Sequence, residues 1–119
     1  MNKHVAVLMS SARYNDEWLL DAVKSVLNEN SDDLVVHIYI FFDGCKSIYG
    51  TSAVCDVLQS KIFADSSPQL RGMAYGLNRC IANVLKSGIW YDYIARMDDD
   101  DLIVAGKFKK QINFLERPD

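Results

Sequence analysis

The stretch IWYDYIARMDDDD, residues 89–101, joins a strand-like segment to four consecutive carboxylates. Residues 89–97 are rich in the aromatic and β-branched side chains that favour strands. Asp98 to Asp101 follow at what we expect to be the carboxyl end of that strand. Open α/β sheets bind ligands at this edge, and clustered carboxylates suit Mg²⁺ or Mn²⁺ that carries substrate phosphates. The stretch therefore predicts a metal-assisted reaction on a phosphorylated donor.

Strand-like and helix-like segments alternate along the rest of the chain. The apolar runs HVAVLMSS at residues 4–11 and LVVHIYIFF at residues 34–42 predict strands buried on both faces. Apolar residues at helical spacing predict four helices. These are a helix capped by Asn15 or Asp16 that runs to Leu27, a helix at 52–62, a helix marked by residues 75–85 that stops at Ser87-Gly88, and a helix from about 105 to 115. Ser66-Ser67-Pro68 is interpreted as a break in the chain.

This alternation predicts an α/β fold with a mostly parallel sheet flanked by helices and right-handed crossovers. The chain has 119 residues, half of them hydrophobic, which is enough to bury one core. We therefore expect a single domain over residues 1–119.

Composition argues against several functional classes. The net charge of −3 and the lack of a basic stripe argue against nucleic-acid binding. The three cysteines form no CxxC pair, so we predict neither a disulfide framework nor a zinc site and expect a reducing cytoplasm. No apolar stretch in this chain is long enough to predict a signal peptide or a membrane segment.

The acidic run has the D-x-D spacing of a metal site. Alternate side chains of an extended or turning segment share a face, so Asp98 and Asp100 are predicted to point together while Asp99 and Asp101 point elsewhere. A cation would relieve the repulsion between these neighbouring carboxylates and could bridge them to a diphosphate. A solvated acidic loop that caps the next helix would explain the same run, so the motif alone leaves both interpretations open.

Other loops at the same predicted edge offer groups that suit a nucleotide. Asp43 ends the second apolar run and could accept hydrogen bonds from a ribose or a base, although Asp-Gly is also a common turn. Tyr14 follows the first strand and could stack on a base or simply pack. Arg71 precedes a helix amino end, where it could bind a diphosphate or remain solvated. Their convergence on one edge favours a nucleotide-binding cleft.

Five segments, taken in order, resemble family 2 glycosyltransferases with the GT-A fold, the nucleotide-diphospho-sugar transferase type. They span nearly the whole chain. They are residues 5–9 with Tyr14-Asn15, AVKSVLN at 22–28, Phe42-Asp43-Gly44-Cys45, Gly72-Met73-Ala74 with Leu77-Asn78, and IARMDDDD at 94–101 with QINFL at 111–115.

The resemblance implies a role for each site residue. Tyr14 and Asp43 would contact the nucleobase, and Arg71 would lie near the phosphates. Asp98 would lie near the ribose and the metal, and Asp100 would be the principal ligand of Mn²⁺ or Mg²⁺. The cation would offset charge on the departing nucleoside diphosphate while an acceptor hydroxyl attacks in line, with inversion.

The resemblance also implies the partners and the setting. The donor would be a nucleotide-diphosphate sugar, with a UDP-sugar favoured, and the acceptor a glycan or a lipid-linked molecule in surface polysaccharide or glycoconjugate synthesis. The full-length protein would act in the cytoplasm, at the inner face of the membrane. The family's general base is expected beyond residue 119, so we expect this chain to be the amino-terminal part of a truncated GT-A fold and assign no catalytic residue.

Two departures from the family pattern bear on base recognition, and two other functions stay open. Phe42 replaces the first Asp of the family's DDGS turn, and Ala12 and Arg13 enlarge the first loop. A non-catalytic nucleotide-binding lobe would use the same cleft. A phospho-receiver-like module is the weaker alternative, because it needs an acidic pair after its first strand, where this chain has Ser10 and Ser11.

Overall fold

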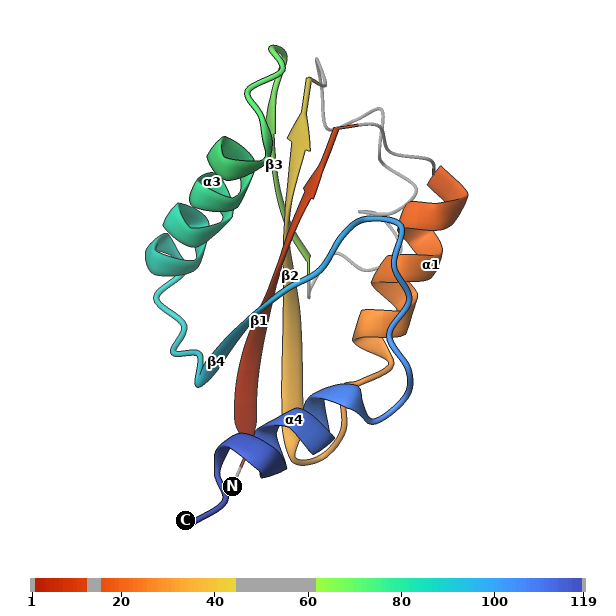
Figure 1. The fold of residues 1–119 in the computed structure, drawn as a ribbon. Coiled ribbons are helices and arrows are strands. Elements are labelled where there is room, and N and C mark those ends of the chain that lie inside the picture. Colours follow the sequence, from red (N-terminus) through yellow and green to blue (C-terminus); the bar gives the residue numbers. More distant parts are fainter. Residues whose placement is uncertain (1, 13–15, 45–61, 119) are drawn as a thin grey trace.

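The computed structural model describes residues 2–12, 16–44 and 62–118 (Figure 1). Within these ranges the chain forms a four-stranded sheet with helices on both of its faces. The elements are β1 (Lys3–Ser11), α1 (Asp16–Leu27), β2 (Leu34–Asp43), β3 (Ile62–Ser67), α3 (Met73–Lys86), β4 (Tyr93–Arg96) and α4 (Lys107–Leu115). Most of the helix that we predict over 52–62 lies outside the described residues.

The sheet is parallel throughout, with strand order β3-β2-β1-β4. The chain steps outward from β1 to β2 and β3, then returns to place β4 on the other side of β1. The order therefore reverses between β1 and β4, and open α/β sheets bind ligands beside such a reversal, at the carboxyl ends of the strands. These ends point to the top of Figure 1. The predicted α/β fold with a parallel sheet is confirmed.

Two apolar layers sandwich the sheet because β1 and β2 carry apolar residues on both faces. Val5, Val7 and Met9 of β1 pack with residues of α1 and α4 on one face. Ala6 and Leu8 pack on the other face with residues of α3. Figure 1 shows α3 and α1 on opposite sides of the sheet. Burial of these runs supplies the main driving force for folding and fixes the strand ends that carry the polar residues.

Helix α3 approaches β1 closely through its small residues. Gly76, Cys80 and Val84 form its buried side. A Cβ atom at Gly76 would lie 2.3 Å from Ser10 Oγ, so no larger residue fits here without movement. The close approach brings the amino end of α3 next to the carboxyl end of β1.

Strand β3 is an element that the sequence analysis missed. Ile62, which we expected at the end of a helix, begins β3, and Ser66 and Ser67 pair with β2 rather than break the chain. The segment IFADSS lacks a regular apolar pattern because β3 is an edge strand. Its Asp65 is paired with Arg79 and Asn83 of α3.

The last strand and the last helix are shorter than predicted. β4 covers only Tyr93–Arg96 of the predicted 89–97, and Trp90 is exposed. β4 lies at the other edge of the sheet, where only β1 is available to pair with it. α4 begins at Lys107, two residues after the expected start at 105, and buries Phe108 and Ile112.

Candidate functional site

The carboxyl ends of β1 and β4 meet where the strand order reverses. The backbone N–H of Met97 donates to the Leu8 carbonyl (3.1 Å), which extends the pairing to the start of the acidic run. The Ser11 hydroxyl at the end of β1 donates to Asp99 Oδ2 at 2.5 Å. The acidic run therefore lies at the sheet edge that the sequence analysis expected.

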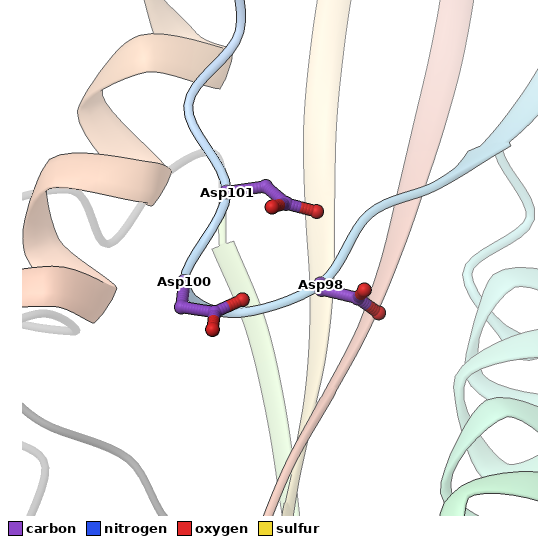
Figure 2. Close-up of side chains that lie close together, drawn as sticks. All are labelled: Asp98, Asp100 and Asp101. Atoms are coloured by element: carbon purple, nitrogen blue, oxygen red, sulfur yellow. The ribbon is translucent and has the colours of Figure 1, made fainter.

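Three of the four carboxylates gather on one turn. Carboxylate oxygens of Asp98, Asp100 and Asp101, here called the acidic triad, lie within 4.8 Å of one another. Figure 2 shows Asp100 and Asp101 extending toward the side of the loop on which Asp98 lies. Asp99 is directed instead to Ser11.

The position of Asp101 corrects the prediction from alternation. The Asp101 N–H donates to the Asp98 carbonyl at 3.3 Å, so the run is a turn and not an extended segment. The first and fourth residues of such a turn lie close together, which brings Asp101 back toward Asp98. Asp98 and Asp100 do lie together, as predicted, and Asp99 points away.

The acidic triad has the chemistry of a site for a hard divalent cation. Its three exposed carboxylates offer the oxygen ligands that Mg²⁺ and Mn²⁺ prefer. Arg96 Nη2 lies 4.0 Å from Asp98 Oδ1, but both side chains are more than half exposed, so this pair offsets little of the repulsion. A bound cation would compensate the remaining charge.

Hydrogen bonds to α1 and to the turn just after it hold the loop that follows the acidic triad. Ser25 Oγ accepts the N–H of Ile103 at 3.0 Å. Glu29, only 8% exposed, accepts the N–H groups of Gly106 and Phe108 at 2.9 and 3.1 Å. This carboxylate caps the amino end of α4, where Gly106 has no side chain to do so. Sequence reasoning missed Ser25 and Glu29, because no local pattern links them to residues so far along the chain.

Asp43 joins the end of β2 to the start of α3. It is 3% exposed, and its Oδ1 and Oδ2 accept the backbone N–H groups of Arg71 and Gly72 at 2.7 and 2.8 Å. The Arg71 guanidinium is exposed, donates to Gln69 Oε1 at 2.6 Å and lies 5.6 Å from the centre of the Tyr75 ring. Asp43 and Arg71 thus lie at the predicted edge, while Tyr14 lies outside the described residues.

The acidic run, Asp98 to Asp101, lies between two hollows in the surface. A cleft of about 510 Å³, here called the α3 cleft, lies between the strand ends and α3; its lining includes Ser10, Asp43, Gly72 and Asp99. A second hollow of about 300 Å³ is lined by Asp98, Asp101 and Lys107, among others. Asp99 thus belongs to a different hollow from Asp98 and Asp101.

Comparison with known proteins assigns the family. Residues 12–119 match the model of the family described as Glycosyl transferase family 2. The chain belongs to glycosyl transferase family 2. This membership favours a glycosyltransferase over the phospho-receiver-like module that the sequence left open. No curated protein matches the chain.

Among solved structures, this family 2 chain is similar to the crystal structure of S. aureus TarS 1-349. The TM-score is 0.70 at 14% identity, over 98% of this chain and 32% of the TarS chain. At this low identity the likeness shows the fold alone. The likeness supports a GT-A-like arrangement of the strands and helices. The chain spans about 32% of the length of that structure. Within the described ranges, no helix is both long and apolar enough to cross a membrane.

Proposed function

We propose that this chain forms the donor-binding half of an inverting, metal-dependent glycosyltransferase. The enzyme transfers a sugar from a nucleoside-diphosphate sugar to an acceptor hydroxyl. The observation that carries the proposal is the acidic triad, placed in a family 2 chain at the edge where the strand order reverses. A UDP-sugar is the favoured donor, and the acceptor is a glycan or a lipid-linked molecule.

Asp98 and Asp100 are the proposed metal ligands, and Asp101 is close enough to act with them. Mn²⁺ or Mg²⁺ bound there supplies positive charge that offsets the charge developing on the leaving diphosphate. Ser25 of α1 and Glu29, just after α1, accept backbone hydrogen bonds from the following loop and hold it in place, so the ligands need little rearrangement when a cation arrives.

The proposed nucleotide contacts are Tyr14, Asp43, Arg71 and Asp98. The two backbone N–H groups that bind Asp43 fix its carboxylate at the wall of the α3 cleft, and each oxygen keeps a lone pair for a base N–H. The Arg71 guanidinium lies at the same edge and carries the positive charge that a diphosphate requires. No residue of this chain is proposed as the general base.

We further propose a role in surface polysaccharide or glycoconjugate synthesis in the cytoplasm, at the inner face of the membrane. Support for this setting comes from the family resemblance alone.

Calorimetric titration with UDP and with GDP, each with and without Mn²⁺, tests the proposed function. Binding that requires Mn²⁺ supports a metal-dependent donor site, and the tighter nucleotide identifies the base. A folded chain that binds neither nucleotide in the presence of Mn²⁺ contradicts the proposal for this chain.

A further inference from the structure

Helix α4 exposes large apolar side chains on the side that faces away from the core. The helix buries two of its residues in the core, whereas Phe114 and Leu115 are 64% and 65% exposed. These two residues line a surface hollow of about 470 Å³ together with Lys110 and Gln111. The four residues are here called the α4 patch. Large apolar side chains that lie together at the surface mark a contact with a protein or a membrane.

Two cations lie next to these apolar side chains. Lys110 lines the α4 patch, and the guanidinium carbon of Arg117 lies 4.3 Å from the centre of the Phe114 ring. Among the described residues, neither cation forms an ion pair with a carboxylate. Residues 107–118 carry four basic side chains and one acidic side chain, although the whole chain has a net charge of −3. The α4 patch therefore lies in a positively charged segment of an acidic chain.

Ion pairs connect α4 to the starts of β1 and β2. Lys3 Nζ lies 3.0 Å from Glu116 Oε2, and Lys109 Nζ lies 3.2 Å from Asp33 Oδ2. Because both carboxylates are paired in this way, they offset less of the positive charge at the α4 patch. Helix α4 lies at the bottom of Figure 1, at the opposite end of the sheet from the carboxyl ends of the strands. A contact at the α4 patch therefore leaves the proposed donor site accessible.

An anionic membrane surface matches both properties of the α4 patch. The apolar side chains of an interfacial helix enter the headgroup region, while neighbouring Lys and Arg side chains attract anionic lipids. The same surface repels the acidic run at the other end of the sheet, so the charge distribution favours the orientation with α4 toward the lipid. A two-fold contact between two α4 patches would instead bring like charges together, which disfavours a second copy of this chain as the partner.

We infer that the α4 patch and Arg117 bind the surface of an anionic membrane. Phe114 and Leu115 enter the headgroup region, and Lys110 and Arg117 contact the lipid phosphates. This inference goes beyond the proposed reaction, because it assigns a function to the end of the sheet that lies away from the donor site. The contact requires neither a nucleotide nor a metal ion, so its failure is distinguishable from failure of the donor site.

Cosedimentation with lipid vesicles, without nucleotide or Mn²⁺, tests the inference. One set of vesicles contains phosphatidylcholine alone, and the other contains equal parts of phosphatidylcholine and phosphatidylglycerol. The chain should bind the anionic vesicles more tightly, and added salt should weaken that binding. Lys110→Gln should lower the affinity about fivefold, since each basic residue near an anionic surface contributes roughly this much. Phe114→Ala should lower it by about tenfold, because the buried part of the ring is lost.

The double variant Leu85→Ala with Lys86→Gln is the matched control. It removes an exposed apolar side chain and an exposed basic side chain from the last turn of α3, outside the α4 patch. This variant should bind the vesicles as the wild-type chain does, and circular dichroism should show that all variants fold. Equal losses of affinity in this control and in the α4 variants would overturn the inference.

Two other outcomes would also overturn it. One is a folded wild-type chain that does not bind the anionic vesicles. The other is self-association in sedimentation equilibrium that Phe114→Ala abolishes, in a chain that does not bind vesicles, because this result would assign the α4 patch to a second copy.

Discussion

The Ser11 hydroxyl and the Asp99 carboxylate form a 2.5 Å hydrogen bond that joins the end of β1 to the loop after β4. It crosses the sheet edge where the strand order reverses. The bond directs the Asp99 side chain away from those of Asp98, Asp100 and Asp101, so the four aspartates contribute to two different surfaces. One surface is the acidic triad, and the other lines the α3 cleft.

Removing the Asp43 carboxylate should affect both stability and binding. Asp43→Ala leaves the N–H groups of Arg71 and Gly72 without their acceptor, which we expect to cost about 2–3 kcal/mol in the free energy of unfolding. Nucleotide affinity should fall as well, because the α3 cleft loses a carboxylate that we propose contacts the nucleotide. Urea denaturation and calorimetry measure the two effects. Unchanged stability would show that these amide bonds do not hold the start of α3.

Glu29 should stabilise the chain through the amino end of α4. Glu29→Ala should lower the free energy of unfolding by about 1–3 kcal/mol, because two N–H groups lose a buried acceptor. Glu29→Gln retains one acceptor oxygen and should cost less. Asp21→Ala, which removes an exposed carboxylate from α1, is the matched control and should change stability by less than about 0.5 kcal/mol. Equal effects of Glu29→Ala and Asp21→Ala would contradict the capping role.

Asp65 should make stability depend on pH in the acidic range. Burial raises the pKa of Asp65, but hydrogen bonds from Asn83, Arg79 and the Ser66 N–H outweigh that effect and hold the pKa below its usual value. A lowered pKa in the folded state means that the stabilisation is complete above the unfolded pKa of about 3.9 and is lost as pH falls through the folded value.

Asp65→Asn tests this expectation against the wild-type chain. The variant should be less stable by about 1 kcal/mol at pH 7, and the difference should shrink at pH 3. Urea denaturation at the two pH values measures it. A difference that stays constant between pH 7 and pH 3 would show that ionisation of Asp65 does not contribute to stability.

The elements that the sequence predicted well are those with a strong local pattern. The run at 34–42 is apolar throughout and forms β2, and the helical spacing from Trp18 to Leu27 forms α1. β3 was missed because IFADSS carries polar residues whose partners lie on α3. Local periodicity holds no information about such partners.

In the candidate site, too, the features that depend on local sequence were predicted and those that depend on distant residues were not. The place of the acidic run follows from the strand before it, and the pairing of Asp98 with Asp100 follows from their spacing. Asp101 lies close to Asp98 because the backbone turns between them, and a prediction from alternating side chains does not include such a turn. The contacts of Ser11 with Asp99 and of Glu29 with the start of α4 join residues far apart in the chain, so only the folded structure reveals them.

The measurement that tests the central claim most directly is the Mn²⁺ dependence of UDP binding in the Asp100→Ala variant. Asp32→Ala, which removes an exposed carboxylate just before β2, at the amino-terminal end of that strand, is the control. We predict that Asp100→Ala keeps its fold, as judged by circular dichroism, and loses the Mn²⁺-dependent part of the affinity, while Asp32→Ala binds as the wild-type chain does. Unchanged Mn²⁺-dependent affinity in Asp100→Ala would contradict the assignment of the metal site.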